Sequence, residues 1–161
     1  MIRLLKCLLA LFVALLCIFY ALQNVVNLQA AYAFVALMAG MEGHVAYPET
    51  FGFAVSSPAL IWLILWIIIL SEFAAGICAA KGAFDMWGAR NADSAVFNSS
   101  KKLAIFGAGL GVVIWFGYFH AIGGAFFQMW QTQAGAQPLQ GAFQYAMLCG
   151  LMMIVLSMQD E

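Results

Sequence analysis

The sequence predicts an all-α integral membrane protein, a four-helix bundle with a short interfacial helix between its first and second spans. Two observations support this prediction. Of the 161 residues, 66% are hydrophobic and only 8% are charged, proportions far outside the usual range of soluble domains. The apolar residues also gather in runs close to the roughly 20 residues that a helix needs to cross ~30 Å of hydrocarbon. The whole chain, 1–161, is therefore predicted to be a single membrane domain.

The predicted spans are about 4–22, 59–80, 103–122 and 141–158. The first could instead be a cleaved signal peptide, but it lacks a convincing small-x-small cleavage site, and we expect an uncleaved anchor. Ser57 can cap the second helix, and Pro58 suits its first turn. Pro138 is expected to open the fourth helix in the same way, and a polar residue within 98–100 is expected to cap the third.

The connection after the first span is itself apolar. Its segment AAYAFVALMAGM is about 12 residues long, too short to cross a bilayer and too apolar to lie free in water. We predict an interfacial helix or a cover over the outer end of the bundle. The connection between the second and third spans is more polar, and Lys81 and Asp85 have the i,i+4 spacing of a helical ion pair. The second helix is therefore expected to continue beyond the membrane before a turn.

The basic residues predict the orientation of the chain. They lie before or at the start of the first span and between the second and third: Arg3, Lys6, Lys81, Arg90, Lys101 and Lys102. Because lysine and arginine in short connections favour the cytoplasmic side, both termini and the central connection are expected inside. The predicted location is the bacterial cytoplasmic (inner) membrane, with several passes and with both termini cytoplasmic.

Glu72 is the acidic residue within a predicted span, in the run IILSEFAAGI. An ionised carboxylate in hydrocarbon costs on the order of 3 kcal/mol on insertion scales, so Glu72 must face protein or water, or be protonated. Ser71 and Gly76 belong to a small-residue surface that lets another helix approach. At about 1.5 Å per residue, Trp115 of the third span lies at a depth from which its indole N–H can reach Glu72 if the faces meet. Whether Glu72 serves architecture or mechanism stays open.

A second group of candidates is expected on the outer side: His44, His120, Gln128, Trp130 and Gln131. His44 and His120 could meet and bind haem or a metal, but without ligand spacing the favoured interpretation is interfacial hydrogen bonding. The segment FFQMWQTQ is either an aromatic interfacial belt, which we favour, or a docking surface or quinone contact. We predict no metal and no cofactor.

Other features of the chain argue against several classes of protein. The net charge of −1 gives no basic surface for nucleic acid. The four cysteines form no C-x-x-C pair and are expected to be packing residues. Gly107 and Gly111 form a G-x-x-x-G pair, which is more often structural than functional. No catalytic fingerprint is present, so we predict no catalytic residues and no enzyme.

Several short segments of the chain resemble those of a known family. In order, they are NVVNLQAAYAFV after the first span, SPAL, NADSAVFN, WFGYFHAIGGAFFQMWQTQ and the closing LSMQDE. Together they resemble the bacterial family of predicted small integral membrane proteins known as domain of unknown function 2165. The resemblance covers essentially the whole chain. It implies a four-span membrane protein and supplies no catalytic residues.

Three functions remain open from the sequence. The predicted one is a non-enzymatic accessory or self-associating subunit of a membrane complex, in contact with the lipid bilayer and with further copies or other membrane proteins. The second is an oligomeric transporter, channel or proton-relay component that uses Glu72. The third is a redox membrane subunit that contacts quinone or haem through His44, His120 and the outer aromatic residues.

Overall fold

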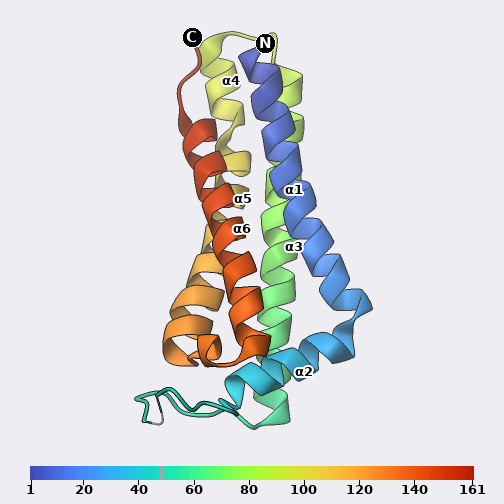
Figure 1. Cartoon of the computed structure of the whole chain (residues 1–161). Coiled ribbons are helices and arrows are strands. Elements are labelled where there is room, and N and C mark those ends of the chain that lie inside the picture. Colours follow the sequence, from blue (N-terminus) through green and yellow to red (C-terminus); the bar gives the residue numbers. More distant parts are fainter. Residues whose placement is uncertain (48) are drawn as a thin grey trace.

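The computed structural model describes residues 1–47 and 49–161, which form helices and loops without a strand. Four apolar helices are long enough to cross a membrane: α1 (Ile2–Val26), α3 (Pro58–Ala89), a composite helix over Ser94–Phe126, and α6 (Gln133–Ser157). They run side by side as a bundle, with both termini at the same end (Figure 1). The predicted all-α four-helix bundle is confirmed.

The composite third helix consists of α4 (Ser94–Ser100), α5 (Lys102–Val112) and η1 (Val113–Phe126). The last of these is a π-helix, a wider form that proteins mostly use as single turns and frequently at functional sites. After it, Gln128 adopts a left-handed conformation with φ 50°, which turns the chain into the short helix η2 (Met129–Gln131). The widened helix thus lies next to the end of the bundle opposite the termini.

The short apolar helix predicted between the first two long helices is present as α2 (Leu28–Ala39). It lies across the end of the bundle opposite the termini (Figure 1). Val35 of α2 and Ile61, Leu65 and Ile69 of α3 form a buried apolar cluster. This packing holds α2 against the start of α3, so the apolar connection covers that end of the bundle.

Small residues bring the long helices close together. A Cβ added at Gly76 of α3 would lie 2.5 Å from the side chain of Ile18 on α1. A Cβ added at Gly107 of α5 would lie 2.5 Å from the backbone nitrogen of Ala79 on α3, and Gly111 lies similarly close to α6. Backbones this close leave no room for a larger side chain. The predicted small-residue positions therefore pack within the chain.

The start of α6 differs from the prediction. The helix begins at Gln133, and Thr132 precedes it with a side-chain oxygen that accepts a hydrogen bond from the Gly135 N–H at 3.1 Å. Pro138, expected to open the helix, lies inside it. The threonine provides the capping acceptor earlier in the chain, and this local signal outweighs the preference of proline for the first turn.

The third long helix also begins earlier than predicted, because its first residue is Ser94. The polar residues 98–100 therefore lie inside α4 and do not cap a helix start; the buried Phe97 holds this first turn against the bundle. In contrast, α3 begins at Pro58 as predicted, although the Ser57 side chain makes no capping hydrogen bond. The expected continuation of this helix beyond its span is confirmed, since α3 extends to Ala89.

Candidate functional site

Glu72 lies in the middle of α3 and is only 1% exposed. Its Oε2 accepts a hydrogen bond from Nδ2 of Asn24, near the end of α1, at 3.0 Å. Trp115, the donor that helical depth suggested, lies in the same cavity without making this bond. The sequence contains little to single out Asn24, which lies just beyond the predicted first span.

The carboxyl of Glu72 borders a cavity of about 410 Å³ between α1, α3, η1 and α6. Aromatic side chains dominate its lining, and they are Tyr20, Phe34, Trp115, Phe119 and Tyr145. The ring centroid of Trp115 lies 6.0 Å from that of Tyr20 and 5.5 Å from that of Tyr145. The hydroxyls of Tyr20 and Tyr145 are hydrogen-bonded to each other. We call this space the acidic cavity.

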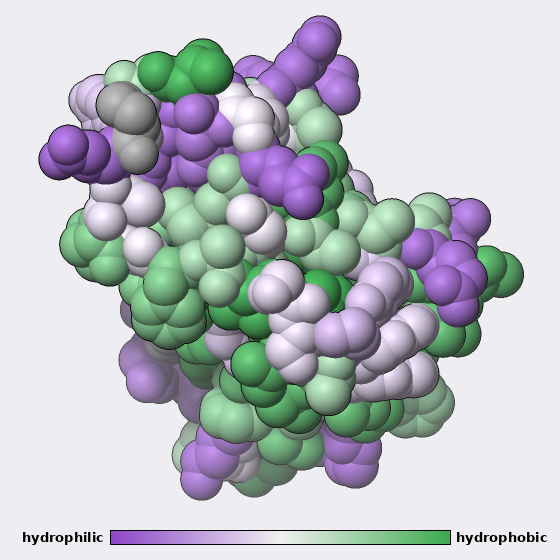
Figure 2. All heavy atoms as spheres, turned by 90° about the horizontal axis from the view of Figure 1, so that it is seen from below, coloured by the Kyte–Doolittle hydropathy of each residue, from purple (hydrophilic) through white to green (hydrophobic). Residues whose placement is uncertain are grey.

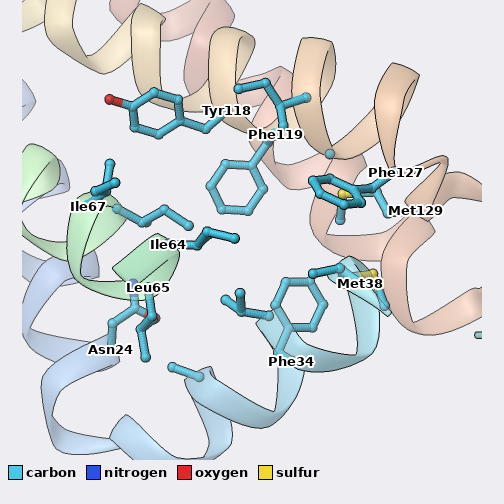
Figure 3. A pocket seen from close by; sticks show the side chains of 16 residues that line it. Asn24, Phe34, Met38, Ile64, Leu65, Ile67, Tyr118, Phe119, Phe127 and Met129 are labelled. Carbon is cyan, nitrogen blue, oxygen red and sulfur yellow. The ribbon is translucent and has the colours of Figure 1, made fainter. Parts of the chain in front are cut away.

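A second cavity of about 370 Å³ adjoins the first, and we call it the apolar cavity. It lies between α2, α3 and η1, where side chains including Phe34, Ile64 and Phe119 extend into it (Figure 3). Asn24, Phe34 and Phe119 line both cavities, so the two spaces are neighbours. The π-helical η1 supplies lining residues to each of them, which links the widened helix to the site.

The positive charges of the chain lie elsewhere. Among the described residues that line either cavity, none is a lysine, arginine or histidine. All six lysines and arginines fall within 3–6 and 81–102, toward the end of the bundle that holds the termini. Glu72 therefore has no cationic partner among these lining residues.

The hydroxyl of Ser71, next to Glu72, binds within the chain. It donates to the Ile67 carbonyl at 2.6 Å and lies 3.3 Å from the hydroxyl of Tyr118.

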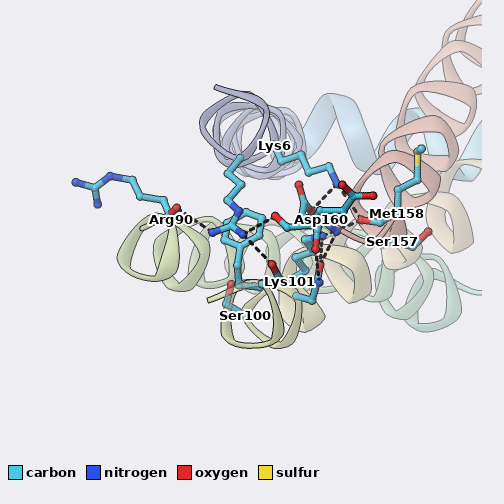
Figure 4. A network of polar contacts seen from close by, with 12 residues as sticks. Lys6, Arg90, Ser100, Lys101, Ser157, Met158 and Asp160 are labelled. Carbon is cyan, nitrogen blue, oxygen red and sulfur yellow. Dashed lines mark hydrogen bonds and ion pairs between the residues drawn. The ribbon is translucent and has the colours of Figure 1, made fainter. Parts of the chain in front are cut away.

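A different polar cluster closes the end of the bundle that holds the termini (Figure 4). Oδ2 of Asp160 accepts hydrogen bonds from Nζ of Lys6, at 2.7 Å, and from Nζ of Lys101. The Met158 carbonyl accepts from the same two ammonium groups at 2.9 and 2.8 Å. Oδ1 of Asn98 accepts from the backbone N–H of Asp160 at 3.0 Å. We call these five residues the terminal clamp.

The carboxylate of the terminal clamp is paired with two ammonium groups. Burial on its own would raise the pKa of the Asp160 carboxyl, but hydrogen bonds from Lys101 and Lys6 outweigh it and hold that pKa below its ordinary value. Nearby, the Arg3 guanidinium donates to the carbonyls of Ala92, at 2.6 Å, and Glu161, at 3.0 Å. These contacts fasten the segment after α6 to α1 and to the turn before α4.

The outer candidate residues bind parts of the same chain to one another. Oε1 of Gln131 accepts from the backbone N–H groups of Ala46, at 2.8 Å, and Tyr47, at 3.0 Å. Gln128 hydrogen-bonds to Gln131, and the ring of Trp130 lies 5.3 Å from that of Tyr47. Seen from this end, the middle of the molecule shows apolar groups next to weakly polar ones, and strongly hydrophilic groups gather above and to the right of it (Figure 2). These residues therefore hold the connection before α3 against η2.

The two histidines lie in different settings. His120 is on η1, and its ring centroid lies 6.0 Å from that of Phe143. Its Nε2 is buried and has no hydrogen-bond partner among the described residues. His44 lies in the connection between α2 and α3 and is half-buried. Within residues 1–47 and 49–161, no group of three or more histidine, cysteine, aspartate or glutamate side chains is placed to hold a metal ion.

These features define a small integral membrane protein of four long helices, with a buried carboxyl beside open cavities between its helices. The chain matches the family model described as "predicted small integral membrane protein (DUF2165)" over residues 2–159. It belongs to this family, and the resemblance seen in the sequence is confirmed. No curated protein and no solved structure matches the chain.

Proposed function

We propose that this protein binds a small lipophilic molecule inside its bundle and acts as a non-enzymatic carrier component in the membrane. The observation that supports this function is the pair of adjoining cavities of about 370 and 410 Å³, with Glu72 at the polar end. Both volumes fall within the ~300–1,000 Å³ range of small-molecule sites, which combine apolar walls with a few placed polar groups. This proposal develops the transport hypothesis drawn from the intramembrane acid.

Binding of a neutral lipophilic probe tests the proposal. The protein is placed in phosphatidylcholine nanodiscs, and saturable binding of tritiated 1-decanol is measured above that of empty discs. Ala31 of α2 lines the apolar cavity, so Ala31→Phe is expected to weaken binding at least about fivefold by occupying the space. Ala33→Phe, on the exposed side of the same helix, is the matched control and should leave binding unchanged. Absence of saturable binding, or equal effects of the two variants, would contradict the proposal.

Assembly as an accessory or self-associating subunit is a second candidate. It is favoured by a ridge of exposed apolar side chains along one face of α3: Leu63, Leu70, Ile77 and Phe84. Their spacing of seven residues keeps them on one side of the helix, where lipid or another chain can contact them. Mass measurement and partner identification after purification in mild detergent test this candidate. A strict monomer that copurifies with nothing would count against it.

The redox alternative has a direct spectroscopic test. Its motivation lies in His44 and His120, and in the aromatic side chains at the α2 end of the bundle. A Soret band or extractable quinone in the purified protein would support a haem- or quinone-contacting subunit. A sample with neither would contradict it.

For the orientation, we infer that both termini face the cytoplasm of a bacterial cell, in its inner membrane. The support is the segregation of the six basic residues toward the end of the bundle where the termini lie. Reporter fusions after Gly52, Asp93 and Glu161 test this orientation. The fusion after Gly52 should report an outside location and the other two an inside location; an outside Asp93 would overturn it.

A further inference from the structure

In the described part of the chain, Glu72 has fewer hydrogen-bond partners than a buried ionised carboxylate needs. Oε2 accepts from the neutral amide of Asn24 at 3.0 Å, and no other hydrogen bond to this side chain occurs in the described part of the chain. With 1% of its surface exposed, the side chain has little access to water. A carboxylate in such a place needs a proton or a positive charge, because a neutral amide leaves its charge uncompensated.

The walls of the acidic cavity suit a positive charge that comes from outside the chain. The rings of Tyr20, Trp115 and Tyr145 lie within 4.7 to 6.0 Å of one another, centroid to centroid, on the cavity that Glu72 lines. Aromatic faces attract ammonium groups through the ring quadrupole, and the attraction grows when water is excluded. Carboxylate and rings together therefore favour a cation over a neutral or an anionic group.

The neighbouring apolar cavity suits an uncharged tail. Of its sixteen lining residues, Asn24 and Tyr118 are the ones with an oxygen or nitrogen in the side chain. The rest are alanine, glycine and larger apolar residues, among them Ile64 and Phe127. Because Phe34 and Phe119 border both spaces, one molecule can place its head beside Glu72 and its tail between α2 and η1.

We infer that the molecule bound here is a lipophilic amine or quaternary ammonium compound whose cationic head pairs with Glu72 and whose apolar tail fills the apolar cavity. This inference rests on the proposed function, because it names the chemical class of ligand for the same site. The head supplies the positive charge that the lining residues lack. The tail supplies the apolar contacts that a simple cation cannot make.

A matched pair of probes tests the inference. Decyltrimethylammonium and 1-decanol share one chain and differ in the head, and the ammonium charge of the first does not depend on pH. Binding of each is measured to the protein in phosphatidylcholine nanodiscs, with empty discs subtracted. We expect the wild-type protein to prefer the ammonium compound by roughly tenfold or more. Decanoate, with the same chain length and a negative head, should bind more weakly than decanol.

Variants test whether Glu72 is responsible for the preference for the ammonium compound. Glu72→Gln is expected to abolish the preference for the ammonium compound while decanol binding stays within about twofold. Glu72→Asp keeps the charge and should keep most of the preference. Glu42→Gln, which neutralises an exposed acid on the connection after α2, is the matched control and should behave as wild type. A preference that persists in Glu72→Gln would overturn Glu72 as the partner of the cation.

The outcomes separate the two proposals. Saturable decanol binding by the wild type, with no preference for the ammonium compound, overturns the inferred ligand class and leaves the proposed function standing. Absence of saturable binding by all three probes overturns both. Decanoate bound as tightly as the ammonium compound also overturns the ligand class. These comparisons use the wild-type protein, so they do not depend on whether a variant folds.

Discussion

The protein buries charged or chargeable side chains in two regions, and their partners differ. In the terminal clamp, Asp160 is 8% exposed and accepts hydrogen bonds from Lys6 and Lys101, which are 4% and 1% exposed. In the middle of the bundle, Glu72 is buried at least as deeply, but its hydrogen-bond partner is the neutral Asn24. In the described part of the chain, one region pairs its buried carboxyl with cationic side chains, and the other pairs it with a neutral amide alone.

The difference separates two uses of buried polarity. The terminal clamp joins residues 6, 101 and 160, which are far apart in the sequence, by direct contacts between their side chains. Glu72, in contrast, borders a space of about 410 Å³. A buried ionisable group without a charged partner, set beside a cavity, is a candidate for function, whereas a cluster of paired charges more often serves structure.

Asp160→Asn is expected to have the largest effect on stability. It leaves the ammonium groups of Lys6 and Lys101 buried without a negative partner, which typically costs about 3 kcal/mol or more. The thermal unfolding midpoint in mild detergent should fall clearly, and protease should cleave the segment after α6 more readily. Glu161→Gln, at an exposed neighbouring position, is the control. If both variants unfold at the wild-type temperature, the clamp does not hold this end together.

Acid should weaken the same region. Because the pKa of Asp160 in the folded protein lies below its ordinary value, its ionised form favours folding. This stabilisation is fully present above about pH 4, the ordinary range of an aspartate, and is lost as the pH falls through the lowered pKa. When unfolding midpoints are measured from pH 7 to pH 3, the difference between wild type and Asp160→Asn should narrow as the pH falls below about 4. A constant difference across this range would contradict the prediction.

Much of the fold was predictable because each membrane span is encoded by a long run of consecutive apolar residues. Glu72 was recognisable for the same reason, since a charge within such a run is conspicuous. Its partner was not, because helical rise predicts depth but not which faces meet. Depth pointed to Trp115, whereas the close approach of α1 and α3 at Gly76 brings Asn24 to the carboxyl.

The terminal clamp shows the same limit. Lys6 and Lys101 were informative in the sequence only as markers of orientation. Their contact with Asp160 depends on the packing of three segments separated by more than 50 residues each. The predicted start of α6 was wrong because two nearby residues, Thr132 and Pro138, both indicate a helix start, and the helix begins after the threonine. Competition between two local signals cannot be resolved without the tertiary structure.

Glu72→Gln is expected to change the stability of the protein much less than Asp160→Asn. Glutamine is close in shape, and its side-chain oxygen can still accept the hydrogen bond from Asn24. It also removes a group that is costly to ionise in this place, so stability should stay within about 1 kcal/mol of wild type. The unfolding midpoint measured beside that of Asp160→Asn checks this prediction. A loss as large as that of Asp160→Asn would mean that Glu72 holds the bundle together and would weaken its assignment to ligand binding.

The smallest effect is expected at the ion pair between Lys81 and Asp85, which lies on the surface of α3. The Lys81 side chain is 61% exposed, against 5% for that of Lys6, so water already solvates most of its charge. Exposed i,i+4 pairs contribute about 0.3–0.5 kcal/mol, and salt reduces this further. Lys81→Ala should therefore shift the unfolding midpoint only slightly, and the shift should shrink at high salt. A large loss would show that burial is not what separates the terminal clamp from the other charges of the chain.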